Sequence, residues 1–168
     1  MTILLYAQPY DISAEGFYFK DAEQYADRLK ACRNSLGDPV EEFEIQFIDG
    51  GIIDCELSRA IGLSQANFPL FLDWVDAWDD HEKHAVIIAV GECGYQIDAN
   101  TAPDDFDVDI YHVDSMRELA EQFVDDGLFG DIPAHLVNYI DYDAIARDLN
   151  CDYSEAVIGG ERLIYRCN

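Results

Sequence analysis

Carboxylate side chains recur along this sequence at the spacing of regular secondary structure, on the side opposite to apolar side chains. Between residues 114 and 126, four of them fall within about 40° of one line on a helix. These four are Asp114, Glu118, Glu121 and Asp125. Apolar residues such as Leu119 and Phe123 take the other side. The pattern predicts an amphipathic helix that Asp114 caps and that ends at Asp126.

Two further segments combine an acidic face with an apolar face. From residue 105 to 110, three carboxylates alternate with three apolar side chains, which predicts a strand with acidic side chains about 6.7 Å apart. These carboxylates belong to Asp105, Asp107 and Asp109. Pro69 is placed to begin a helix that runs through Asp80, with Phe71 and Trp74 on its apolar side. Its acidic side carries Asp73, Asp76 and Asp80.

The order of these segments predicts an α+β fold of three parts. Residues 1–55 are expected to form a small sheet plus one helix, residues 56–102 a mostly helical middle domain, and residues 103–168 a C-terminal α+β domain. Strands are predicted over 3–7, 16–19, 43–48 and 105–110, and helices over 20–36, 69–80, 114–126 and 142–149. A hairpin around Gly159-Gly160 closes the chain. The apolar run 84–90 fits a buried strand or a buried helix equally well.

The charge of the chain limits its partners. Acidic residues outnumber basic ones by 35 to 10, so the net charge is -25. Nucleic acid and anionic membranes carry the same sign of charge, and neither is an expected partner. No segment approaches the roughly 20 apolar residues that span a bilayer. No basic segment precedes the short apolar run at the N-terminus, as it would in a signal peptide. We therefore expect a cytoplasmic protein.

The sequence offers no recognisable metal, cofactor or catalytic motif. Its five cysteines are widely spaced without a CxxC pair, which predicts reduced thiols and no zinc site. Asp105, Asp107 and Asp109 have the spacing that opens an EF-hand loop, but Ile110 and Met116 stand where that loop needs glycine and glutamate. We expect no metal, no cofactor and no catalytic residue, although an enzyme that uses paired carboxylates remains one hypothesis.

Composition by itself leaves three interpretations open, namely a generic acidic protein, a halophilic protein and a polyanion mimic. Between residues 73 and 148 there are 20 acidic residues and only three basic ones, Lys83, Arg117 and Arg147. Duplex DNA carries one charge per about 1.7 Å, so 25 charges correspond to about 12 base pairs. This charge is of the order that a protein imitating a short duplex needs.

One segment, IPAHLVNYIDYDAIARDLN at residues 132–150, resembles the antirestriction motif of the ArdA antirestriction proteins. The positions that match are Pro133, Leu136, Tyr139, Ile140, Asp141, Ala146, Arg147, Asp148 and Leu149. The order of the surrounding segments is also similar to that family, from the first strand pair to the closing hairpin. The resemblance covers nearly the whole chain and is sharpest over the motif.

The resemblance implies an elongated, acidic homodimer that mimics bent B-form DNA and occupies the DNA-binding groove, on the methyltransferase core, of type I restriction-modification enzymes. Such an inhibitor protects incoming plasmid or transposon DNA. The residues expected on the DNA-mimic surface are Asp73, Asp76, Asp80, Asp105, Asp107, Asp109, Asp114, Glu118, Glu121, Asp125 and Asp126. The alternative is a generic acidic or halophilic cytosolic interaction protein with no partner that has a DNA site.

In the family, the motif lies at or near the dimer interface, so the resemblance implies structural and interface roles for its matching residues. A helix–helix corner explains the segment YIDYDAIARDL at residues 139–149 differently, with buried tyrosine and leucine and with Arg147 paired to a carboxylate. The two interpretations are compatible.

Overall fold

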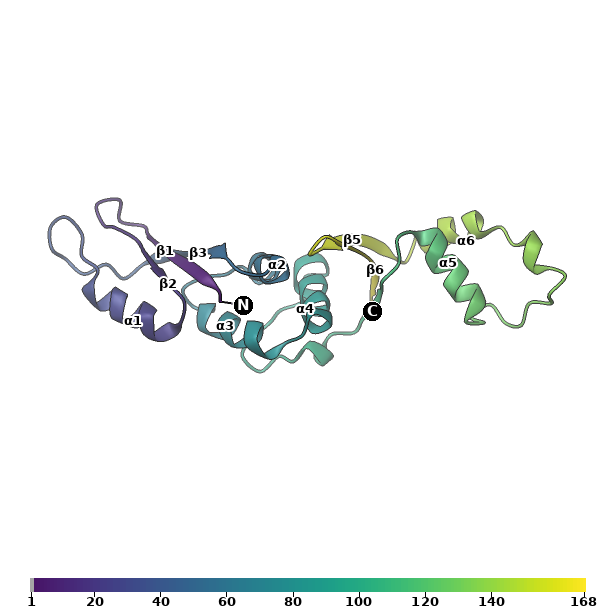
Figure 1. The fold of residues 1–168 in the computed structure, drawn as a ribbon, viewed down its shortest axis with the longest axis horizontal. Helices are drawn as coiled ribbons and strands as arrows, with labels where there is room; N and C mark the ends of the chain where they lie inside the picture. The colour runs from purple at the N-terminus through teal and green to yellow at the C-terminus, as the bar shows by residue number, and fades with distance from the viewer. Residues whose placement is uncertain (1) are drawn as a thin grey trace. The chain divides into compact units, whose positions relative to one another are not determined.

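The computed structural model describes residues 2–168, and the chain divides into two compact units. The first unit ends at Phe106 and the second comprises Asp107–Asn168. Each unit holds one three-stranded antiparallel sheet together with helices (Figure 1), which confirms the α+β class. The division into domains 1–55, 56–102 and 103–168 stays a prediction.

The sheet of the first unit has the order β2-β1-β3. Its strands are β1 (Leu4–Pro9), β2 (Phe17–Phe19) and β3 (Phe43–Asp49). Alternate residues of each strand are buried, because one face of the sheet packs on α1 (Ala22–Ala31) and α3 (Phe68–Ala77). The rings of Phe19, Tyr25 and Phe68 form the centre of this contact, at centroid distances of 4.6–5.2 Å. The predicted pieces 1–55 and 56–102 therefore share a core.

The predicted helix 20–36 is wrong at both ends. Asp21 is the N-cap, and its carboxylate accepts a hydrogen bond from the Gln24 backbone N–H at 2.7 Å. The helix ends at Ala31 because the Asn34 side chain accepts hydrogen bonds from the backbone N–H groups of Leu36 and Asp38 and so holds a turn there.

The predicted helix 69–80 is two helices. Helix α3 stops at Ala77, where Trp78 takes an extended conformation. Asp79 then caps α4 (Asp80–Val86) in a capping box, since Asp79 and Glu82 each accept the other's backbone N–H. The chain continues from α4 into a π-helix at Ile87–Glu92 and packs on α2 (Ile52–Ala60). The run 84–90 is thus helical.

The predicted strand 105–110 is also partly wrong. A 3-10 helix covers Pro103–Asp105, and the Asp105 carboxylate accepts a hydrogen bond from the Ala102 backbone N–H at 2.8 Å. Extended pairing begins only at β4 (Val108–Tyr111). Asp105 therefore does not share a strand face with Asp109.

The second unit is close to its prediction. Its sheet has the order β4-β6-β5, with the hairpin β5 (Ser154–Ile158) and β6 (Glu161–Cys167) turning at Gly159 and Gly160, which both have positive φ. Helices α5 (Met116–Asp125) and α6 (Tyr142–Leu149) share an apolar core with the sheet. This core includes Leu119, Phe123, Ala146, Tyr153 and Ile164.

Cys32, Cys55 and Cys151 are free thiols, as expected. Within residues 2–168, no helix has the length and apolar character needed to cross a membrane.

Asp54 of α2 is the only acidic residue buried within the described part of the chain, and it has a basic partner. The Lys83 ammonium of α4 donates a hydrogen bond to its carboxylate at 2.8 Å, and both side chains are 8% exposed. Desolvation of two charges costs several kcal/mol per ion, so the pair persists because each charge compensates the other. The pair ties α2 to α4.

Removing one member of this pair should destabilise the first unit. Lys83→Met leaves the Asp54 carboxylate buried without its ion pair, and we expect a loss of about 3 kcal/mol in the free energy of unfolding, measured in urea. Asp27→Ala is the matched control, because the Lys30–Asp27 pair is largely exposed and should contribute less than about 1 kcal/mol. Equal losses in the two variants would contradict this account.

Candidate functional site: carboxylate surfaces of the two units

Helix α5 carries the longest predicted acidic stripe. Its N-cap is Ser115, whose hydroxyl accepts a hydrogen bond from the Glu118 backbone N–H at 3.2 Å, and not Asp114 as predicted. The sequence Ser115-x-x-Glu118 has the spacing of a capping box, and the Glu118 carboxylate accepts the Asp114 backbone N–H at 2.8 Å. The Asp114 side chain is exposed before the start of α5, and those of Asp125 and Asp126 are exposed at its C-terminal end.

Arg117 of α5 forms ion pairs with two carboxylates, one on α5 and one on α6. Its guanidinium donates to Glu121 at 3.0 Å and to Asp143 of α6 at 2.7 Å. The hydrogen bond to Asp143 and the charge of that carboxylate are the main causes that raise the pKa of the Arg117 guanidinium. Asp143 is not among the site residues predicted from the sequence, because this contact joins residues far apart in the chain.

The carboxylates of and beside β4 differ in their surroundings. Asp109 lies directly across from Arg166 on β6 and accepts a hydrogen bond from its guanidinium at 2.7 Å. This hydrogen bond raises the pKa of Arg166, which also lies over the Tyr153 ring at 5.2 Å. Asp107 is exposed and accepts a hydrogen bond from the Asn168 side chain at 3.2 Å. Asp109 is therefore the more compensated charge of the two.

In the first unit, the predicted acidic residues lie on separate elements. Asp73 and Asp76 project from the exposed side of α3, opposite the buried Phe71 and Trp74, and line a groove with Lys20. Asp80 begins α4 and Asp105 belongs to the 3-10 helix described above. Of the eleven predicted surface carboxylates in the two units, only Asp109 and Glu121 are half-buried, and the others are exposed.

The motif residues divide into two groups. Asp141 caps α6 by accepting the Ala144 backbone N–H at 3.0 Å, Ala146 is buried, and Ile140 and Leu149 are half-buried. The remaining motif residues are exposed, and they are Pro133, Leu136, Tyr139, Arg147 and Asp148.

The helix–helix corner interpretation required buried tyrosine and leucine in the motif. It is wrong for Tyr139, which is 83% exposed, whereas Tyr142 and Leu149 are half-buried and pack against the core of the second unit. It is also wrong for Arg147, which forms no ion pair within residues 2–168. Arg117 takes the place that this interpretation gave to Arg147.

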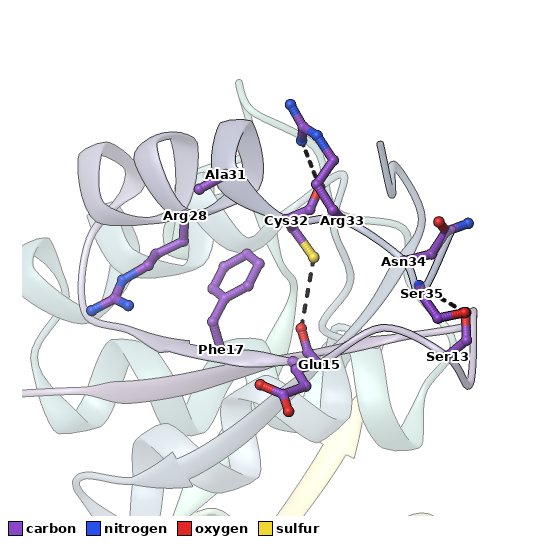
Figure 2. Close-up of a pocket in the computed structure, with 10 residues that line it drawn as sticks. Ser13, Glu15, Phe17, Arg28, Ala31, Cys32, Arg33, Asn34 and Ser35 are labelled. Carbon is purple, nitrogen blue, oxygen red and sulfur yellow. Dashed lines mark hydrogen bonds between the residues drawn. The ribbon is translucent and has the colours of Figure 1, made fainter. Parts of the chain in front are cut away.

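A pocket in the first unit lies at the end of α1 (Figure 2). The Arg33 guanidinium turns back onto the carbonyl oxygens of Lys30 and Cys32, at 2.9 and 2.7 Å. The Cys32 thiol faces the Glu15 carbonyl oxygen at 3.6 Å. These groups hold the chain where α1 ends. Within residues 2–168, no three potential metal-binding side chains group together.

A sequence model described as Antirestriction protein (ArdA) matches residues 15–161, which is most of the 168-residue chain. The chain belongs to the ArdA antirestriction protein family. The matched span contains every predicted acidic surface residue and every motif residue of this ArdA family member. No curated protein matches the chain.

The cap of α5 can be tested in this ArdA family member by two neighbouring substitutions. Ser115→Ala removes the hydroxyl that accepts the Glu118 N–H and should lower the free energy of unfolding by about 1 kcal/mol in urea titrations. Asp114→Ala leaves that hydrogen bond intact and should change stability by less than about 0.5 kcal/mol. A larger loss of stability in Asp114→Ala than in Ser115→Ala would show that Asp114, and not Ser115, is the N-cap.

Proposed function

We propose that this ArdA family member is a DNA mimic that occupies the DNA-binding groove of type I restriction-modification enzymes and blocks restriction. The observation that carries the proposal is that most of the few basic residues between residues 73 and 148 are engaged in ion pairs within the chain. Lys83 is buried against Asp54 and Arg117 is paired with two carboxylates. Arg147 is the only basic residue of that segment without an ion pair in the described chain.

The carboxylates thus remain largely uncompensated in both units. The first unit has 21 acidic and six basic residues, a net charge of -15, and the second has 14 acidic and four basic residues, a net charge of -10. An enzyme that grips DNA does so mainly through lysine and arginine on phosphates, and exposed carboxylates can accept the same hydrogen bonds. Because phosphate contacts carry no base sequence, one such inhibitor would act on enzymes of different sequence specificity.

The proposed mechanism is occupation and not catalysis. Most of the affinity would come from the counterions that are released when the carboxylates contact the basic side chains of the groove. The long-range attraction between opposite charges would make association fast. The inhibitor works where the restriction enzyme meets incoming DNA, so the proposal places it in the cytoplasm. If the inhibitor occupies the groove of the methyltransferase core, it also blocks modification of the DNA.

We further propose that the chain forms a homodimer through the connection between α5 and α6. This connection exposes several large apolar side chains, and a monomer would leave them in water. They are Leu128, Phe129, Leu136, Val137 and Tyr139. A twofold dimer would double the charge to -50 and extend the array of carboxylates.

The proposed function predicts competition with DNA. The purified chain should displace a labelled duplex from a type I methyltransferase, and its apparent affinity should fall as salt rises, because exposed charge contacts are screened. Fluorescence anisotropy at several salt concentrations measures both effects. A cooperative melt in dilute buffer is the control that removes the halophilic alternative. Failure to displace DNA from several such enzymes at moderate salt would contradict the proposal.

The proposed dimer predicts a dependence on exposed motif residues. Tyr139→Ala and Arg147→Ala should shift sedimentation toward the monomer, with a dimer dissociation constant raised at least about fivefold, as expected for residues central to an interface. Tyr10→Ala is the control, since Tyr10 is also exposed at 66% but lies outside the motif. An unchanged dimer in both motif variants would remove them from the interface.

A further inference from the structure

The outer face of the sheet in the first unit, opposite to the face that packs on α1 and α3, carries a row of polar and aromatic side chains. Tyr6 of the central strand β1 pairs in register with Tyr18 of β2 on one side and with Gln46 of β3 on the other. The rings of Tyr6 and Tyr18 lie 4.7 Å apart between centroids, tilted by 50°. Tyr18 is 58% exposed and Tyr6 is half-buried, so the pair forms an aromatic surface that is partly open to solvent.

The tyrosine row is held in place by its surroundings. Strand pairing on both sides fixes the backbone of Tyr6. A Cβ atom at Gly16 would overlap the Tyr6 ring and would lie 2.5 Å from the Ala7 carbonyl oxygen. Only glycine at position 16 leaves room for the ring there, and the pair is therefore preorganised.

The strands that carry the row contribute only negative charge. The three strands contain Glu44 and Asp49 but no lysine or arginine. The exposed Glu44 lies one step diagonally from Tyr6, because it pairs with Gln8 while Gln46 pairs with Tyr6. One of its oxygens accepts a hydrogen bond from the Gln46 side chain at 3.1 Å. Arg59 of α2 lines the groove beside β3 with Glu44, but they form no ion pair in the described chain.

We propose that this outer face, which we call the tyrosine face (Tyr6, Tyr18, Glu44 and Gln46), docks an arginine side chain of a basic protein partner. A guanidinium fits both parts of the face, since it stacks on aromatic rings and donates planar pairs of hydrogen bonds to a carboxylate. The ammonium of a lysine supplies the positive charge but lacks the planar shape and the paired donors of a guanidinium. A second copy of this chain is not the expected occupant, because the proposed dimer forms through the exposed apolar side chains between α5 and α6.

The identity of the partner rests on the proposed function. A groove that binds DNA phosphates is rich in arginine, since the guanidinium matches phosphate oxygens in pairs. An arginine displaced from a phosphate contact could then dock on the tyrosine face. This face would add a contact of defined geometry to the diffuse attraction between carboxylates and cations.

The first part of the test does not use a restriction enzyme. Nona-arginine and nona-lysine peptides are titrated into the full chain by calorimetry, and the ratio of their dissociation constants removes the effect of charge alone. The wild type should prefer the arginine peptide at least about threefold. The double variant Tyr6→Leu/Tyr18→Leu should bring the ratio close to one, whereas Tyr10→Leu, an exposed tyrosine outside the face, should keep it.

Ring signals of Tyr6 and Tyr18 in NMR spectra of the wild-type chain should also shift with the arginine peptide and much less with the lysine peptide. This measurement decides the matter if the double variant does not fold. No preference for arginine, an unchanged ratio in a folded double variant, or unmoved ring signals would each overturn the inference.

The second part uses DNA displacement from a type I methyltransferase. The wild type should displace DNA at least about threefold more strongly than the double variant. Equal displacement by both would overturn the assignment of this enzyme as the partner of the face. If the wild type displaces no DNA, the proposed function fails, while the peptide titrations still decide whether the face binds arginine.

Discussion

Ionised carboxylates are excluded from an apolar interior unless a positive charge accompanies them, and this constraint shapes every element of the chain. The strands of the first unit bury alternate residues, and α3 and α5 turn their acidic residues away from Phe71 and Phe123. Asp54 departs from the pattern and is paired with Lys83 at 2.8 Å. A chain with 35 acidic residues can therefore fold only by making its surface acidic.

Most of the few basic residues form their contacts with groups of the same chain. Arg166 pairs with Asp109 across the second sheet, Arg162 pairs with Glu155, and Arg117 joins α5 to α6 through Asp143. Each of these contacts compensates one carboxylate of the same unit and leaves other carboxylates in water without compensation. The uncompensated carboxylates are what the proposed mimicry of DNA requires. Membership of the ArdA family and the physical account thus support the same proposal from different starting points.

Local patterns predicted the elements that local signals define. Helix α6 was predicted at its observed bounds, because Asp141 caps it and its apolar period is regular. The hairpin followed from Gly159-Gly160. The errors arose where a nearby residue competes for the same role, as Ser115 does with Asp114, or where a cap interrupts an apolar pattern, as Asp79 does after Trp78. Pairings such as Arg117 with Asp143 and Tyr6 with Tyr18 depend on packing and register, which periodicity does not specify.

The central claim is that the carboxylates act collectively through charge. Its most direct test is a series of chains in which exposed carboxylates of α3 and α5, such as Asp73, Asp76, Glu118 and Asp125, are changed to amides one after another. The dissociation constant for a type I methyltransferase is measured for each. We expect affinity to fall in small steps of similar size with each lost charge. A single substitution that abolishes binding, or a complete series without effect, would contradict the account.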